Sequence, residues 1–165
     1  MINETEQKVY NILDSLNIEY KRYEHQPVYT IEDASKLNIN IPGTLCKNLF
    51  LRNNKGNTHY LVIIEDSKRV NLKSLSEQIN SSSLSFASEE RLDKYLGLKP
   101  GSVSPFGLIN DINKEVIVLI DKDVAASDIV SFHPNVNTCT IGLSYSDFEK
   151  FVNWHENKLY TIYVN

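Results

Sequence analysis

Two apolar segments joined by a polar turn constrain the fold of this sequence more than any other feature. Residues 45–51 (LCKNLFL) and 59–65 (HYLVIIE) are each long enough to form a core strand. Between them, residues 53–57 read NNKGN, and asparagine and glycine favour the tight turn of a hairpin. The sequence therefore predicts a β-hairpin inside a larger sheet.

Helical and strand-like segments alternate along the rest of the chain. Apolar residues at helical spacing predict a helix that ends near Asn17. Further helices are predicted after residues whose side chains can cap a helix N-terminus: Thr30, Asn71, Ser88 and Ser144. Further strands are predicted at residues 84–86, 106–109, 116–120, 129–132 and 138–141. This order predicts the α/β class, with a mixed sheet surrounded by helices in a single domain spanning residues 1–165.

The composition bounds the class of protein. With 165 residues, 41% of them hydrophobic, the chain can bury a core without metals or disulfides. Cys46 and Cys139 match no zinc-binding spacing, so we interpret both as partly buried filler residues. The formal charge of -4 disfavours binding of a nucleic-acid backbone over a wide surface. Any contact with nucleic acid should therefore involve a local patch. The polar N-terminus and the lack of a long apolar run predict a cytoplasmic protein without a membrane partner.

Lys47 lies inside the first strand of the predicted hairpin. Side chains two residues apart on a strand point to one face, so Lys47 shares its face with Leu45, Leu49 and Leu51. A lysine there can present a cation or a desolvated amine to an anionic or carbonyl oxygen. The alternative is snorkelling, in which the stem packs on apolar neighbours and the ammonium stays in water.

Further positions could contribute to a site, each with a structural alternative. Asn48 should point to the face opposite Lys47 unless the strand is irregular, and alone it is a hydrogen bonder at a strand edge. The loop GSVSP at residues 101–105 either is an ordinary turn or offers free backbone amides to an oxyanion. His133 follows a predicted strand, at a rim where substrates often bind, and His25 could lie at a similar rim. The sequence contains no common hydrolase, nucleotide-binding or zinc motif.

Four segments in order resemble a known family. They are CKNLFLR at residues 46–52, LSFASEERL at 84–92, PGSVSPFGLIND at 100–111 and FHPNVNT at 132–138. Together they resemble the YbaK/ProX-type aminoacyl-tRNA editing proteins, and within that family the free-standing prolyl-tRNA editing group. The resemblance runs from about His25 to Val152. Each motif alone is weak, whereas the four in this order are specific.

The resemblance implies a fold, partners and a site. The fold would be one α/β domain with a mixed, partly barrel-like sheet and a cleft for the 3′ end of tRNA. The partners would be the acceptor end of misacylated tRNA and prolyl-tRNA synthetase, with no role for DNA, a cofactor or a metal. The implied catalytic residues are Lys47, Asn48, Gly101 and His133, and the implied substrate-binding residues are Val28, Thr30, Ser102, Val103, Ser104 and Pro105.

The activity implied by the resemblance is hydrolysis of an aminoacyl ester, most similar to removal of alanine from Ala-tRNA(Pro). Lys47 would hold the ester carbonyl or the terminal phosphate, loop amides would stabilise developing charge, and His133 with Asn48 would orient the substrate. Alternatives are the editing of cysteine or serine esters, a non-catalytic accessory domain that binds tRNA or a synthetase, and a Schiff-base enzyme that uses Lys47. The tail at residues 155–165 departs from the family pattern, and no role is predicted for it.

Overall fold

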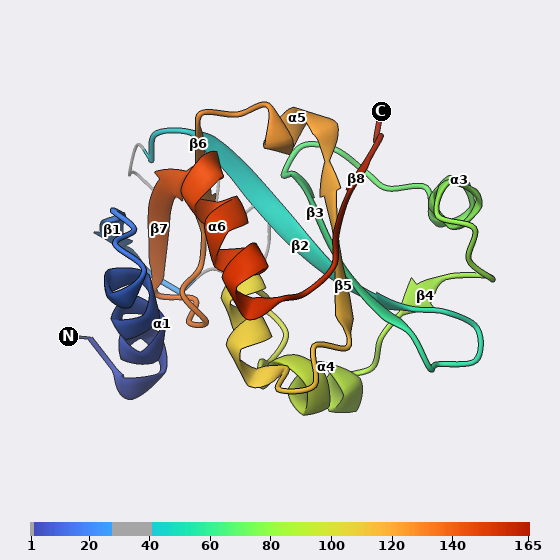
Figure 1. Ribbon diagram of the computed structural model, residues 1–165, viewed down its shortest axis with the longest axis horizontal. Coiled ribbons are helices and arrows are strands. Elements are labelled where there is room, and N and C mark those ends of the chain that lie inside the picture. The colour runs from blue at the N-terminus through green and yellow to red at the C-terminus, as the bar shows by residue number, and fades with distance from the viewer. Residues whose placement is uncertain (1, 28–40) are drawn as a thin grey trace.

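The protein is a mixed sheet with helices packed on both of its faces (Figure 1). The computed structural model describes residues 2–27 and 41–165. Its sheet has eight strands in the order β1-β7-β6-β2-β3-β5-β8, and β4 pairs with β2 beside this path. The strands are β1 (Lys21–Glu24), β2 (Thr44–Arg52), β3 (His59–Glu65), β4 (Ser85–Phe86), β5 (Val116–Asp121), β6 (Ile129–Phe132), β7 (Cys139–Ser144) and β8 (Leu159–Ile162).

The helices begin where the sequence offers a capping side chain. They are α1 (Glu4–Ser15), α3 (Leu72–Gln78), α4 (Glu89–Leu96), the 3-10 helix η1 (Pro105–Asn110), α5 (Lys122–Ala125) and α6 (Tyr145–His155). The Asn71 side chain accepts a hydrogen bond from the Ser74 amide, and Ser88 and Ser144 cap α4 and α6 in the same way. These predicted caps are therefore confirmed.

The predicted hairpin is confirmed as β2 and β3. The two strands pair antiparallel from Cys46 opposite Glu65 to Arg52 opposite His59. Gly56 lies in the turn between them with a φ of 71°, a left-handed conformation that glycine adopts without steric cost. β3 then pairs parallel with β5, which gives the sheet its mixed character.

β2 joins two parts of the sheet. One part contains β1, β7 and β6, and the other contains β3, β5 and β8. Along the edge of β2 opposite β3, pairing with β6 ends at Leu45, and pairing with β4 begins at Leu51. Among the described strands, none pairs with this edge at residues 46–49, which we call the β2 seam.

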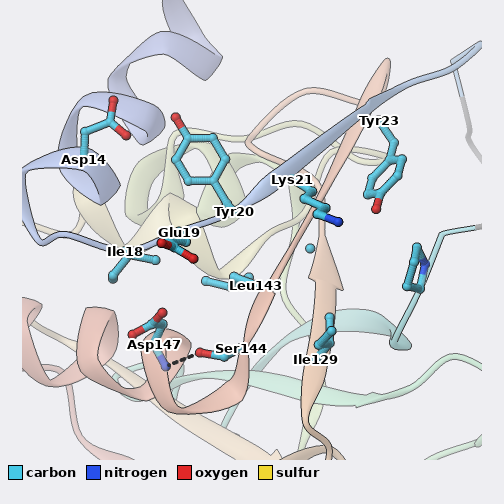
Figure 2. A pocket seen from close by; sticks show the side chains of 12 residues that line it. Asp14, Ile18, Glu19, Tyr20, Lys21, Tyr23, Ile129, Leu143, Ser144 and Asp147 are labelled. Atoms are coloured by element: carbon cyan, nitrogen blue, oxygen red, sulfur yellow. Dashed lines mark hydrogen bonds between the residues drawn. The ribbon is translucent and has the colours of Figure 1, made fainter.

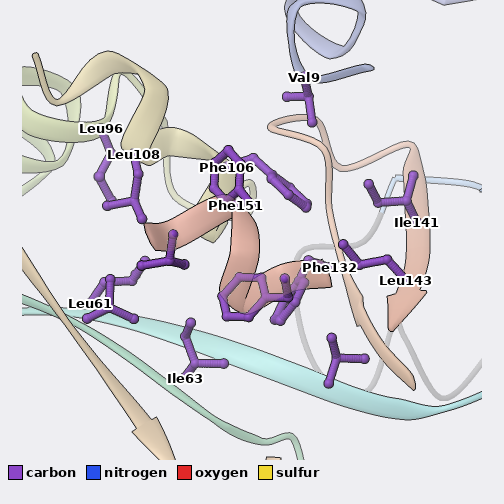
Figure 3. Close-up of a cluster of buried hydrophobic side chains, with 14 of the residues drawn as sticks. Val9, Leu61, Ile63, Leu96, Phe106, Leu108, Phe132, Ile141, Leu143 and Phe151 are labelled. Carbon is purple, nitrogen blue, oxygen red and sulfur yellow. The ribbon is translucent and has the colours of Figure 1, made fainter. Parts of the chain in front are cut away.

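Two hydrophobic cores lie on opposite faces of the sheet. The main core packs Phe50, Ile63 and Phe132 against helices α1, α4, α6 and η1 (Figure 3). The second core packs Leu51, Val62 and Ile64 against Leu75 of α3. Because strand side chains alternate, successive residues of β2 face different cores.

Residues 106–109 are part of η1, so the prediction of a strand there is wrong. Pro105 fits the first turn of a helix, and the Ser104 hydroxyl accepts a hydrogen bond from the Phe106 amide at 3.1 Å. Pro105 to Leu108 are all buried, so this apolar run lacks the alternation that separates strand from helix.

The C-terminal tail supplies the strand at one end of the sheet. β8 runs parallel to β5, with Val118 opposite Leu159 and Asp121 opposite Ile162. The Lys68 ammonium donates hydrogen bonds to the Asp121 carboxylate at 2.6 Å and to the Val164 carbonyl at 2.8 Å. The sheet path ends at β1 on one side and β8 on the other, so among the described strands it does not close into a barrel.

Some predictions fall outside the described residues. They concern Val28, Thr30 and the helix predicted after Thr30. Within residues 2–27 and 41–165, no helix combines the length and apolar character needed to cross a membrane.

Candidate active site

Lys47 lies on β2 in the face predicted from the sequence. It pairs with Ile64, and alternation gives it the same face as Leu49 and Leu51 of the second core. The residue is half-buried, and no ion pair joins it to a carboxylate within the described part of the chain. Its ammonium is therefore not committed to a structural salt bridge there.

The pairing of β2 with β6 ends two residues before Lys47 and His133. The two strands pair in parallel with Thr44 opposite Val130 and Leu45 opposite Ser131. Alternation from these pairs gives Lys47 and His133 the same face of the sheet, just beyond the end of the paired segment. Since β6 ends at Phe132 and β2 continues, the two residues flank the point where the β2 seam opens.

His133 is held as a neutral imidazole with one nitrogen available. Its Nδ1 lies 2.8 Å from the Cys139 carbonyl oxygen, which can only accept, so Nδ1 carries the hydrogen. Burial lowers the pKa of His133, and the neighbouring His25 acts in the same direction, while the Cys139 carbonyl opposes them. Nε2 therefore has a lone pair, and no described residue forms a hydrogen bond to it.

Asn48 faces the main core, as strand alternation predicts. It pairs with Ile63, whose side chain belongs to that core. Its Oδ1 atom is buried and has no hydrogen-bond partner within residues 2–27 and 41–165. A buried oxygen without a partner is rare in folded proteins, so this acceptor is a candidate contact for a bound molecule.

Asn135 was missed by the sequence reasoning. It is 6% exposed, and its Oδ1 also has no hydrogen-bond partner among the described residues. Its φ of 64° is left-handed, which asparagine tolerates better than most residues. The sequence signal was an asparagine in the turn directly after His133-Pro134.

The loop at residues 101–105 offers fewer free amides than its length suggests. Pro105 has no N–H, and the Ser102 amide donates to the Lys99 carbonyl at 3.1 Å. Ser104 is fully buried and its hydroxyl is used in the cap of η1. Within the described residues, the amides of Gly101, Val103 and Ser104 thus remain without a partner. Val103 packs against the main core, so the loop lies on the face of Asn48.

The predicted site residues therefore form two groups. Lys47 and His133 share one face of the sheet, and Asn48 and the 101–105 loop belong to the main-core face. Lys47 and Asn48 are adjacent residues within the β2 seam. A substrate at the seam could contact both groups because none of the described strands covers that edge of β2.

A separate cavity lies between α1, β1 and the start of α6 (Figure 2). It has a volume of about 880 Å³, and none of the predicted site residues lines it. Carboxylates from Asp14, Glu19 and Asp147 border it, against one ammonium from Lys21, so it is a poor site for a phosphate. Its size also exceeds what a single small amino acid needs.

The comparisons with known proteins agree with the fold and the motifs. Residues 25–151 match the model of the aminoacyl-tRNA editing domain. The chain is 47% identical over 154 residues to the prolyl-tRNA editing protein ProX of Acetoanaerobium sticklandii, covering 93% of this chain and 94% of that protein. It is 33% identical over 143 residues to the mouse prolyl-tRNA synthetase associated domain-containing protein 1, covering 85% of each.

A solved structure shares the fold. It is provisionally described as a trans-editing enzyme for prolyl tRNA synthetase, and it superimposes with a TM-score of 0.74 over 100% of this chain and 99% of that chain. The sequence identity is 16%, so this likeness concerns the fold alone.

These matches define an enzyme class, that of the aminoacyl-tRNA deacylases. The chain belongs to the aminoacyl-tRNA editing domain family, with a near full-length relative among the prolyl-tRNA editing proteins. The resemblance drawn from the sequence motifs is thereby confirmed, as is the mixed α/β fold. The roles of individual site residues remain predictions.

Proposed function

We propose that this protein is a trans-editing hydrolase that removes alanine from Ala-tRNA(Pro). Membership in the editing family and the 47% identity to a prolyl-tRNA editing protein support the reaction and the tRNA. The observation that supports the site assignment is the β2–β6 register, which ends two residues before Lys47 and His133 and gives both the same face beside the β2 seam. The partner would be the acceptor end of the tRNA, delivered with or without prolyl-tRNA synthetase.

The reaction would proceed by addition to the ester carbonyl. The oxygen of a water molecule, or of the neighbouring ribose hydroxyl, attacks the carbonyl carbon, and the bond from that carbon to the ribose oxygen then breaks. The ribose oxygen takes up a proton. If the ribose hydroxyl attacks, the alanyl group moves to that hydroxyl and water then hydrolyses the new ester, so the products of both routes are free alanine and tRNA. Such an activated ester requires positioning more than a strong nucleophile.

Lys47 and the loop would stabilise the charge that develops on the carbonyl oxygen. The Lys47 ammonium forms no salt bridge with a described carboxylate, although its charge acts on Asp66 and partly opposes the burial that raises the pKa of that residue. It can therefore hold the carbonyl oxygen or the terminal phosphate. The unpartnered amides of Gly101, Val103 and Ser104 are suitable donors to an oxyanion. Removal of one such contact typically slows an enzyme roughly 100- to 1000-fold.

His133 and Asn48 would orient the substrate. With Nδ1 donating to Cys139, the lone pair of His133 Nε2 can accept from the substrate amino group or a ribose hydroxyl. The unpartnered Oδ1 of Asn48 can accept a second such hydrogen. Each contact favours one pose of the ester.

Shape would then provide the choice of amino acid. An added methylene changes binding by only about 1 to 3 kcal/mol, so a synthetase that admits proline rejects alanine poorly. A second site that is too small for proline can remove alanine after the error. This separation of tasks explains why a free-standing editing enzyme is useful.

The test is deacylation of a panel of tRNA(Pro) esters by the wild type and Lys47→Ala. Rapid release of alanine but not proline, lost in Lys47→Ala, is the expected result. Faster release of cysteine or serine would show that the substrate is a cysteinyl or seryl ester and not the alanyl ester, and the proposed mechanism would still apply. Retained tRNA binding without turnover by the wild type on any ester would make the protein a binding accessory and refute the proposal.

A further inference from the structure

His25 is connected to His133 through a single hydroxyl group. The two imidazole rings lie 5.9 Å apart, inclined by 57°. His25 Nε2 lies 2.8 Å from the Thr140 hydroxyl, which in turn lies 3.5 Å from His133 Nδ1. β1 and β7 fix this arrangement because Tyr23 pairs with Thr140, and the His25 amide continues the ladder to the Thr138 carbonyl at 3.0 Å.

The hydrogen positions follow from the carbonyl groups at each end. His25 Nδ1 lies 2.8 Å from the Gln26 carbonyl, and His133 Nδ1 lies 2.8 Å from the Cys139 carbonyl. Carbonyl oxygens only accept, so Nδ1 carries the hydrogen in both rings. In neutral His25, Nε2 is then an acceptor, and the Thr140 hydroxyl must donate to it.

The Thr140 hydroxyl therefore presents lone pairs to His133. Its only hydrogen is directed at His25, which leaves the oxygen as an acceptor facing the His133 Nδ1–H. The contact at 3.5 Å is long, and the Cys139 carbonyl at 2.8 Å is the main acceptor. Both acceptors favour the same tautomer, with Nε2 unprotonated.

We infer that His25 is a positioning residue for the editing reaction, which acts through Thr140 to hold His133 in the tautomer whose Nε2 accepts from the substrate. This inference rests on the proposed function because it assumes that His133 contacts the substrate. It goes beyond that function by adding two residues, His25 and Thr140, that need not touch the ester themselves.

Few other ionisable groups face this pair within the described residues. On the strands packed around it they are Tyr23 of β1 and Lys47 of β2. The Cys139 thiol faces the main core, where it contacts the Tyr10 hydroxyl at 3.5 Å. Glu24 belongs to the other face of β1 and pairs with Arg22 at 3.0 Å. Changes in the His25–Thr140–His133 chain should therefore dominate the local pH response.

Burial lowers the pKa of His133, and the electrostatic influence of His25 lowers it further. Replacing His25 by phenylalanine removes that second contribution, so the pKa of His133 should rise relative to the wild type.

The experiment compares Thr140→Val with Thr140→Ser on the wild-type ester substrate. Valine keeps the shape of threonine but cannot hydrogen-bond, and we expect kcat to fall about fivefold to tenfold with little change in KM. Serine keeps the hydroxyl and should restore most of the rate. His25→Phe should lower kcat similarly and move the acid limb of the pH profile to higher pH. The double variant should lose no more than either single variant.

A control and a direct measurement complete the test. Thr161→Val replaces an exposed threonine on β8 and should leave kcat unchanged. Imidazole ¹⁵N chemical shifts of the folded wild type should show His133 with Nδ1 protonated and Nε2 unprotonated. This measurement does not depend on whether the variants fold or on their kinetics. Wild-type kinetics in Thr140→Val, or a protonated Nε2 in the wild type, would overturn the inference. A His133→Ala enzyme of full activity would instead overturn the proposed role of His133.

Discussion

Two histidines in different parts of the sheet, one buried and one half-buried, differ in whether Nε2 already has a hydrogen-bond partner. His59 of β3 is 1% exposed, and its ring lies 4.1 Å from Tyr95 and 5.5 Å from Phe50. Its Nε2 accepts a hydrogen bond from the Arg91 guanidinium at 3.0 Å. His133 lies at the end of β6 and has no described partner at Nε2.

The comparison teaches that burial and a lowered pKa do not by themselves mark a functional histidine. Burial lowers the pKa of both residues. What distinguishes His133 is unused hydrogen-bonding capacity beside an uncommitted ammonium on the same face of the sheet. The same criterion selects the unpartnered Oδ1 atoms of Asn48 and Asn135.

The largest expected effect is the loss of activity when Lys47, in the candidate active site, is replaced. Lys47→Ala should lower kcat/KM for alanine release roughly 100- to 1000-fold, since an electrostatic contact to the developing charge is lost. The melting temperature should stay close to that of the wild type, because no described salt bridge is broken. Lys158→Ala, at an exposed lysine before β8, is the matched control. Equal activity of the two variants would remove Lys47 from the mechanism.

The next effect is on stability and concerns His59. Burial, followed by the charge of Arg91, lowers the pKa of His59 from 6.5 to about 4. The unfolded chain therefore binds a proton first as pH falls, so stability is full above pH 6.5 and declines as pH drops toward 4. At roughly 1.4 kcal/mol per pKa unit, the loss approaches about 3 kcal/mol.

Urea unfolding between pH 7 and pH 5 measures this decline. In His59→Phe the ring stacking is kept and the titration is absent, so the pH dependence should be shallower than in the wild type. Parallel curves for the two proteins would show that His59 does not supply the acid sensitivity.

A smaller effect is expected at the histidine of the site. His133→Ala should lower kcat about tenfold to hundredfold, the value of one or two substrate hydrogen bonds. Stability should change less than in His59→Ala, which also removes the partner of Arg91 and the stacking on Tyr95. Kinetics and thermal melts of both variants form one experiment. The distinction between the two histidines is wrong if His59→Ala mainly loses activity and His133→Ala mainly loses stability.

The smallest effect is expected at Gly101. Its φ of 89° is a conformation that residues with a side chain rarely adopt. Gly101→Ala should therefore cost about 1 to 2 kcal/mol in local strain. If the loop relaxes by moving its amides, kcat falls a few-fold with a small change in melting temperature. Gly56→Ala, in the β2–β3 turn with a φ of 71°, carries the same kind of backbone strain, adds a contact of its Cβ with Arg91 Nη2 at 2.8 Å, and should keep full kcat.

Local features of the fold could be predicted from the sequence. The β2–β3 hairpin follows from two apolar runs and a short turn, and the caps Asn71, Ser88 and Ser144 act within a few residues of themselves. The face of Lys47 was predictable for the same reason, since alternation is a property of one strand. The run at 106–109 was misjudged because four apolar residues fit a strand or a buried helical turn equally well.

The candidate site depends on contacts between distant segments. The placement of Lys47 and His133 on one face, just past the paired segment of β2 and β6, depends on the parallel register of those strands, which no local pattern encodes. The link from His25 to Thr140 likewise requires the pairing of β1 with β7. The motif resemblance supplied Lys47, Asn48 and His133 as candidates, but it could not supply the direction of their hydrogen bonds.

The β2 seam has a consequence for how ligands can be detected. Because β2 belongs to both parts of the sheet, a molecule bound along residues 46–49 would contact both parts and stabilise the folded state. Occupancy should then be visible as a rise in melting temperature on addition of a non-hydrolysable ester analogue, without any turnover being followed.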